Sequence, residues 1–368
     1  MKCLKVALTG GPCGGKTTSI DEVVLEFTEK DYRVLVVPEA ATILINMGIK
    51  PFGENKIDNI VFQRMVIDLQ LKLESYAEEV AKKSDKKTII LCDRGIMDDK
   101  AYVTKEQFIE LLKERNLTQF EVCKSYDLVI HLVTAANGKK EFYTLDNNSA
   151  RSESIEEACI RDKKTLEAWL LHDNLKIIGN ETDFKTKINK VIYNIYSMLN
   201  RPYPLQNQEK YLVDNIDLEN IANFSPVKIS IEQYIIPKEN GEVIYRKTSC
   251  DGEVKYSSIV KTDTNINNER IKKQRNISEH EYFTNIPVNE TPIRKVRYCF
   301  EYKEQNFRLD IFADGLKLLE IEDTNKTKKR IIPDYLTVLE DVSNNEIYRN
   351  SYIYTNKNKK ECKVFNKL

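Results

Sequence analysis

Residues 4–29 contain three consecutive sequence patterns: an apolar run, a glycine-rich turn and the apolar spacing of a helix. Residues 4–9 have the continuous apolar character of a buried strand, and residues 17–29 repeat apolar side chains at a spacing near 3.6. Between them, Gly10-Gly-Pro-Cys-Gly-Gly15-Lys16-Thr17 fits the pattern G-x-x-x-x-G-K-[ST]. Because the pattern follows a strand and opens a helix, the sequence predicts a phosphate-binding loop, or P-loop.

A loop of this kind binds the phosphates of a nucleotide together with Mg²⁺. Its backbone amides point at phosphate oxygens, Lys16 neutralises charge on the β and γ phosphates, and the Thr17 hydroxyl is a ligand of the metal. The predicted nucleotide contacts of the loop are Gly10, Gly11, Pro12, Cys13, Gly14, Gly15, Lys16, Thr17 and Thr18.

The first 200 residues continue to alternate short apolar runs with helical patterns, which is typical of a parallel sheet wrapped by helices. Strands are predicted at residues 4–9, 33–38, 88–92, 128–133 and 175–178. Helices are predicted at residues 17–29, 59–82, 105–114, 155–171 and 183–199. We therefore expect residues 1–200 to form one α/β, P-loop kinase-like domain with a five-stranded parallel sheet.

Pro202 and Pro204 mark the end of this domain, because a helix cannot continue through them. Beyond them, apolar and polar side chains alternate in short runs separated by Gly or Asn turns. These strands are predicted at residues 227–236, 243–248, 255–262, 293–302, 307–312 and 316–322. We expect an antiparallel β-rich domain over residues 203–368, with polar segments such as 356–360 as hairpin tips or a frayed tail.

Acidic residues end two of the predicted strands in the first domain. Asp93 follows residues 88–92, where P-loop proteins place a second carboxylate of the magnesium shell, and the pair Asp93-Arg94 resembles the metal- and substrate-binding pair of small-molecule kinases. Glu39 lies at the sheet edge where ligands bind and is a candidate base for an acceptor hydroxyl. The ordinary interpretations are a helix cap for Asp93 and a cap or solvated residue for Glu39.

Four further candidates lie on or beside predicted helices. Gln63 and Arg64 are on a helix that could cover an acceptor pocket, although an ordinary amphipathic helix explains them equally well. Arg151 and Arg161 flank the start of a helix after a polar loop. In kinases such a lid brings arginines to the transferring phosphoryl group, whereas the plain alternative is surface charge.

Residues after the fifth strand are candidates for contact with the nucleotide base. They are Asn180, Thr182 and Asp183, of which the last two could also cap the next helix. Spacing alone does not reveal the loop geometry that selects a base, so GTP and ATP remain alternatives.

Charge and cysteine content narrow the function classes. The chain has 57 Lys and Arg against 57 Asp and Glu, so no whole-molecule field attracts it to nucleic acid or to an anionic membrane. Its eight cysteines form no C-x-x-C pair, which favours reduced thiols over a zinc module or a disulfide framework. No apolar stretch approaches the ~18 residues of a spanning helix. These features predict a cytoplasmic protein without a transmembrane segment or a nucleic-acid partner.

Four segments carry a family resemblance: Pro-Glu-Ala-Ala-Thr at 38–42, Cys-Asp-Arg-Gly-Ile-Met-Asp at 92–98, Tyr-Asp-Leu-Val-Ile-His-Leu at 126–132 and Phe-Tyr-Thr-Leu-Asp-Asn-Asn-Ser-Ala-Arg-Ser at 142–152. Together they resemble the TRPL-translocation-defect family, which joins a kinase-like P-loop domain to a CYTH-like domain. The resemblance is strong over residues 1–195 and weaker after 203. It implies purine-nucleotide binding, described mainly for GTP, and phosphatidic acid as a lipid ligand class.

The same resemblance implies a triphosphate tunnel in the second domain, with cations that grip phosphates and glutamates that hold a metal. The usual opening motif E-x-E-x-K reads Gln206-Asn-Gln-Glu-Lys210 here, so two acids are replaced by amides, which bind Mg²⁺ less well. The implied anion-binding residues are Lys210, Arg246, Lys261, Arg270, Lys295 and Arg297, and the implied metal-binding acids are Glu320 and Glu322. We interpret the tunnel as binding a phosphorylated small molecule or an anionic lipid headgroup without hydrolysis.

Two functions therefore remain open. In the first, the P-loop domain transfers a γ-phosphoryl group to a small nucleoside-like acceptor or hydrolyses nucleotide slowly, and the catalytic residues are Lys16, Asp93, Glu39, Arg151 and Arg161. In the second, nucleotide occupancy gates the binding of phosphatidic acid or another anionic partner without catalysis. Only the first function requires Glu39.

Overall fold

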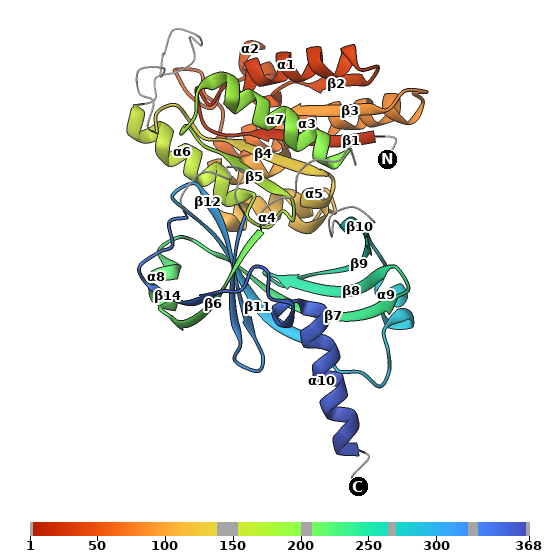
Figure 1. Cartoon of the computed structure of the whole chain (residues 1–368). Helices are drawn as coiled ribbons and strands as arrows, with labels where there is room; N and C mark the ends of the chain where they lie inside the picture. Colours follow the sequence, from red (N-terminus) through yellow and green to blue (C-terminus); the bar gives the residue numbers. More distant parts are fainter. Residues whose placement is uncertain (1–2, 138–153, 200–207, 264–269, 323–329, 366–368) are drawn as a thin grey trace. The chain divides into compact units, whose positions relative to one another are not determined.

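The computed structural model describes residues 3–137, 154–199, 208–263, 270–322 and 330–365 of the 368-residue chain. The chain divides into two compact units, Met1–Pro204 and Leu205–Leu368. Each unit is built around its own sheet, and most of the strands and helices are labelled in Figure 1. The two units are described separately below.

The first unit contains a five-stranded parallel sheet in the order β2-β3-β1-β4-β5, which confirms the predicted α/β class. The strands are β1 (Cys3–Thr9), β2 (Arg33–Val37), β3 (Thr88–Asp93), β4 (Leu128–Leu132) and β5 (Leu175–Ile178). The helices are α1 (Lys16–Glu29), α2 (Ala40–Asn46), α3 (Asn59–Lys82), η1 (Ile96–Tyr102), α4 (Lys105–Lys113), α5 (Gln119–Lys124), α6 (Ile155–Ala168) and α7 (Phe184–Met198). Of these, α2, η1 and α5 were not predicted.

Helices cover both faces of this sheet. On one face, Val23 and Phe27 of α1 pack with Val191 and Ile195 of α7 over the apolar side chains of β1, β3 and β4. On the other face, Lys5 of β1 forms a buried ion pair with Glu74 of α3. Because parallel strands all point the same way, this arrangement brings the loops after β1, β2 and β3 to one edge of the sheet.

The second unit contains a nine-stranded sheet whose pairings are antiparallel, in the order β10-β9-β8-β7-β11-β12-β13-β6-β14. The strands are β6 (Gln208–Ile216), β7 (Val227–Lys238), β8 (Gly241–Cys250), β9 (Glu253–Asp263), β10 (Arg270–Asn276), β11 (Ile293–Tyr302), β12 (Gln305–Phe312), β13 (Lys317–Glu322) and β14 (Leu336–Asp341). The antiparallel β-rich class is thereby confirmed. Three helices accompany the sheet, α8 (Leu218–Ala222), α9 (Glu279–Asn285) and α10 (Asn350–Phe365), together with the short turn η3 (Glu346–Tyr348).

The prediction of a frayed tail or hairpin tip at 356–360 was wrong, because these residues belong to α10. Tyr354 anchors this helix in the core beside Tyr234 and Ile235, and its hydroxyl donates a hydrogen bond to Glu290. One buried aromatic side chain thus orders a segment whose composition is polar. Within the described residues, no helix combines the length and the apolar character needed to cross a membrane.

Candidate functional site

The P-loop connects β1 to α1 and lies against the end of β4. Gly10 and Gly15 have φ angles of 134° and 90°, which residues other than glycine rarely adopt. A Cβ on Gly10 would lie 2.1 Å from the carbonyl oxygen of Leu132, and one on Gly14 would lie 2.6 Å from the same atom. Gly10 is therefore required both by the turn and by the backbone of β4, whereas Gly14 is required by the backbone of β4 and Gly15 by the turn.

Lys16 folds back over the P-loop. Its Nζ donates hydrogen bonds to the carbonyl oxygens of Gly10 and Gly11, each at 3.1 Å. Desolvation, helped by the positive charge of Arg94, lowers the pKa of Lys16 to about 8, although Asp93 and Glu39 act in the opposite direction. Thr17 and Thr18 follow it in the exposed first turn of α1.

Asp162 of α6 holds the other side of the loop. Its Oδ1 accepts a hydrogen bond from the Gly11 amide at 2.5 Å and lies 3.2 Å from Nε2 of His131 on β4. Burial opposes ionisation of Asp162, but His131 and the Gly11 amide outweigh it and lower its pKa. The sequence analysis missed this aspartate, and its only signal was its position next to Arg161.

Asp93 ends β3 beside the loop. Its Oδ1 is buried and has no hydrogen-bond partner among the residues that the structure describes. Burial raises the pKa of Asp93, while the nearby charge of Lys16 lowers it. A buried carboxylate oxygen without a donor, close to a phosphate-binding lysine, fits a role as a direct or water-mediated ligand of Mg²⁺. Thr17 would supply the second protein oxygen.

Glu39 and Arg94 form an ion pair at the ends of β2 and β3. Arg94 Nε donates to Glu39 Oε1 at 2.5 Å, and Arg94 Nη1 donates to the carbonyl oxygen of Gly10 at 3.2 Å. Thr42 donates a second hydrogen bond to Glu39 at 2.7 Å. Burial would raise the pKa of Glu39, but Arg94, Lys16 and these hydrogen bonds prevail and bring it to about 2.

Buried residues behind this pair fix the loop after β3. Arg94 has a positive φ of 73°, and its amide donates to the carbonyl oxygen of Leu8. Asp98 of η1 accepts hydrogen bonds from the Thr9 hydroxyl and, at 2.8 Å, from the Gly95 amide. The segment that carries Asp93 and Arg94 is therefore tied directly to the strand that carries the P-loop.

Tyr102, which the sequence analysis also missed, lies between several of the predicted residues. The guanidinium of Arg161 stacks 4.4 Å from its ring centroid, and the charges of Arg94 and Arg161 both act on its hydroxyl, whose pKa burial raises. Asn59 of α3 donates to the Tyr102 carbonyl oxygen at 2.9 Å. Gln63 lies one helical turn after Asn59, is buried, and has an Oε1 with no partner among the described residues.

Other predicted residues do not join this group. Arg64 forms a bidentate ion pair with Glu114, with donor–acceptor distances of 2.8 and 2.9 Å. Its guanidinium is therefore held on another side of α3. Arg151 lies outside the described residues. Asn180 donates to the carbonyl oxygens of Thr134 and Asn137 and accepts from Lys187. These hydrogen bonds stabilise the loop after β5 and occupy the amide that was predicted to contact the base.

The remaining two residues of that loop differ from each other. Asp183 caps α7 by accepting a hydrogen bond from the Thr186 amide at 3.0 Å, the interpretation that the sequence left open beside base contact. Thr182 has a buried hydroxyl oxygen without a partner among the described residues. Thr182 therefore retains a polar group for a ligand.

The second unit gathers cations on one face of its sheet. Lys295 and Asp310 are buried and pair at 2.6 Å, and Arg297 contacts Asp310 at 2.7 Å and Glu320 at 3.2 Å. Lys210 pairs with Glu320 at 3.2 Å. Three cations thus share two carboxylates, which leaves this cluster with excess positive charge for an anion.

Two further predicted cations lie on neighbouring strands. Arg246 of β8 donates to Gln233 at 3.1 Å, and Lys261 of β9 pairs with Glu242 at 2.8 Å. The side chains of Arg270 and Glu322 lie outside the described residues. Glu320, predicted as a metal ligand, has its carboxylate engaged by cations, which lower its pKa despite its burial. No group of three or more His, Cys, Asp or Glu in the described part of the chain is arranged to hold a metal ion.

Parts of this chain are similar to known proteins. Residues 5–187, slightly less than half of the chain, match the model of a family described as an AAA domain, a P-loop NTPase-like domain. No curated protein matches the chain. One matching crystal structure is that of an inorganic triphosphatase, with 17% sequence identity and a TM-score of 0.32 over 42% of this chain and 97% of the triphosphatase. The family match and the loop geometry support nucleotide binding, and the TRPL-translocation-defect resemblance is not confirmed.

Proposed function

We propose that the first unit binds a purine nucleoside triphosphate, GTP or ATP, with Mg²⁺ and transfers its γ-phosphoryl group to a hydroxyl of a small nucleoside-like acceptor. One observation carries this proposal: Lys16 and Arg94 both donate to the Gly10 carbonyl oxygen of the P-loop, Arg94 is paired with Glu39, and Asp93 directly precedes Arg94 at the end of β3. Phosphate binding, metal binding and a place for an acceptor thus meet at one edge of the sheet.

In this reaction the acceptor oxygen forms a bond to the γ phosphorus, and the bond from that phosphorus to the β–γ bridging oxygen breaks. The products are a nucleoside diphosphate and a phosphorylated acceptor. Glu39 orients the hydroxyl as a hydrogen-bond acceptor and receives its proton once Arg94 has turned from Glu39 to the phosphoryl group. When bound, Mg²⁺ neutralises charge on the β and γ phosphates. Arg161, held against Tyr102, stabilises developing charge, and Gln63 offers its unpaired oxygen to the acceptor.

For the second unit, the excess cations at Lys210, Lys295 and Arg297 support binding of a phosphorylated small molecule or an anionic lipid headgroup such as phosphatidic acid. Hydrolysis is not part of this proposal, because Asp310 and Glu320 are already neutralised by cations and make poor metal ligands. Metal-dependent hydrolysis of tripolyphosphate that persists in the full-length Lys16→Ala variant would contradict this assignment.

A nucleotide-gated binding module without catalysis is the second candidate. The observation that favours it is the closed Glu39–Arg94 pair with its additional hydrogen bond from Thr42, because a carboxylate held in this way is a weak base. In that function nucleotide binding would change capture of an anionic partner, and turnover would not respond to any acceptor.

The Glu39→Gln variant separates these two functions. If the first unit is a kinase, acceptor-stimulated diphosphate production should fall roughly 100-fold or more, since Glu39 contacts the acceptor, whereas nucleotide affinity should stay within about threefold because Glu39 makes no direct contact with the nucleotide. Turnover with Mg²⁺ and a panel of nucleosides measures this. Glu29→Gln, an exposed acid at the end of α1, is the matched control. Unchanged acceptor-stimulated turnover in Glu39→Gln would rule out its catalytic role.

The lowered pKa of Lys16 predicts a pH dependence of nucleotide binding. Below a pH of about 8 the free protein carries the ammonium that a triphosphate requires; as the pH rises above this value the ammonium is lost and affinity should fall by up to about tenfold per pH unit. Titration with nucleotide and Mg²⁺ between about pH 6.5 and about pH 9.5, at a constant salt concentration of about 0.1 M so that electrostatic screening does not vary, tests this. Lys16→Arg stays protonated, so whatever affinity it retains should not decline. A flat wild-type profile contradicts the prediction.

A further inference from the structure

An exposed aromatic ring lies directly beside the P-loop. A Cβ on Gly15 would be only 2.7 Å from Cε2 and 3.2 Å from Cζ of Phe184, so the ring covers the position where any other residue would carry its side chain. Phe184 is nevertheless 50% exposed. An apolar ring that leaves half of its surface to solvent next to a phosphate-binding amide is available to a ligand held by those phosphates.

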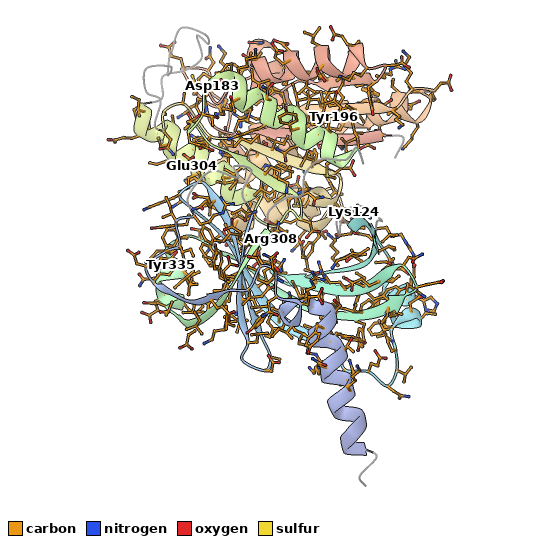
Figure 2. All side chains as sticks on the ribbon, in the orientation of Figure 1. Lys124, Asp183, Tyr196, Glu304, Arg308 and Tyr335 are labelled. Atoms are coloured by element: carbon orange, nitrogen blue, oxygen red, sulfur yellow. The ribbon has the colours of Figure 1, made fainter. Side chains whose placement is uncertain are left out.

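The segment that presents this ring is firmly held. Asp183, labelled in Figure 2, caps α7 immediately before Phe184. Lys187, one turn later, donates to the carbonyl oxygen of Val133 at 2.8 Å and to Asn180 at 2.7 Å, and Asn180 in turn donates to Thr134. The start of α7, which carries the ring, is therefore held against the segment that follows β4.

A polar group with unmet hydrogen-bonding capacity lies two residues away. The Thr182 hydroxyl oxygen is buried and has no partner in the part of the chain that the structure describes. Leaving such a group unpaired is unfavourable, so a ligand atom that pairs with it gains affinity. A ring face and a hydroxyl on one short segment match a flat heterocycle with polar edges.

We propose that the base of the nucleotide stacks on Phe184 and that Thr182 contacts its edge. The inference rests on the proposed nucleotide binding and deepens it. Stacking accepts any base, because every base has a π face, and it favours purines through their larger area. Thr182 adds a directional hydrogen bond. Residues 182–184 therefore recognise the base, and the Asn180 amide, which is already hydrogen-bonded, does not.

The test compares ligands with and without a base. In Phe184→Leu, affinity for GTP and ATP should fall roughly 10- to 100-fold. Affinity for inorganic tripolyphosphate with Mg²⁺, taken from the binding that Lys16→Ala abolishes so that the second unit does not contribute, should stay unchanged. Phe184→Trp should restore nucleotide affinity. Tyr193→Leu removes another aromatic side chain of α7, which is 45% exposed, and should leave the affinity for both ligands unchanged. Equal losses for nucleotides and tripolyphosphate, or no loss for nucleotides, would overturn the stacking role. A wild-type protein that binds no nucleotide would instead overturn the proposed function.

Discussion

Replacing Lys16 with alanine is expected to weaken nucleotide binding by roughly 30-fold or more, about 2 kcal/mol. The ammonium lies over the P-loop, hydrogen-bonded to the carbonyl oxygens of Gly10 and Gly11. In the proposed complex it would exchange these neutral partners for phosphate oxygens. Alanine leaves the phosphates without this charge. Calorimetric titration of the full chain with GTP and with ATP in the presence of Mg²⁺ gives the affinity directly.

Lys30→Ala provides the matched control for this variant. Lys30 caps the other end of α1 and forms an exposed ion pair with Glu26 at 3.3 Å, so its loss should leave nucleotide affinity unchanged. Trp169, the only tryptophan of the chain, is buried in the first unit, and its fluorescence reports whether that unit stays folded. A folded Lys16→Ala variant with wild-type affinity would show that the loop is not the phosphate site.

Replacing Asp310 with asparagine is expected to destabilise the second unit by about 3–5 kcal/mol. The side chains of Asp310 and Lys295 are each 1% exposed, and Arg297 donates two further hydrogen bonds to the same carboxylate. A neutral amide leaves these cations buried without their shared counter-charge. The loss should appear as faster hydrogen exchange in β11 and β12 and as a lower denaturation midpoint of the second unit.

The fluorescence of Trp169 should not change in this variant, because that residue belongs to the first unit. Arg349→Ala is the control within the second unit. It removes an exposed ion pair to Glu346 at 2.8 Å and should cost less than about 0.5 kcal/mol. If Asp310→Asn is as mild as this control, Asp310 does not hold the cations of the sheet together.

The parallel sheet could be predicted from the sequence because four of its strands, β1, β3, β4 and β5, are buried on both faces and so consist of continuous apolar runs. Helix α3 was predicted with the bounds that the structure has, since Asp58 caps its start and its apolar spacing is regular. The segment η1 was missed because its seven residues include Asp98 and Asp99, acids that in most sequences lie at the surface. Asp98 is held in its buried position by a hydrogen bond from Thr9 of β1, a tertiary contact that sequence spacing does not encode.

The candidate site, like the fold, could be predicted from the sequence only in part. Glu39, Asp93 and Arg94 could be predicted because each lies at the carboxyl end of a strand, and such ends meet at one edge. Tyr102 and Asp162 could not, because they reach the site through tertiary packing of η1 and α6. In the second unit, the pairing of Arg297 with Asp310 depends on the register of β11 against β12, which alternation alone leaves open.

Helix α6 gives the two halves of the site a common support. Asp162 holds the P-loop amide of Gly11, while its neighbour Arg161 lies against Tyr102 on the acceptor side. Adjacent residues of one helix cannot shift independently, so a displacement of α6 by an incoming nucleotide must also move the group that faces the acceptor. Donor and acceptor would then bind with heterotropic cooperativity, and the coupling free energy must be the same whichever of the two binds first.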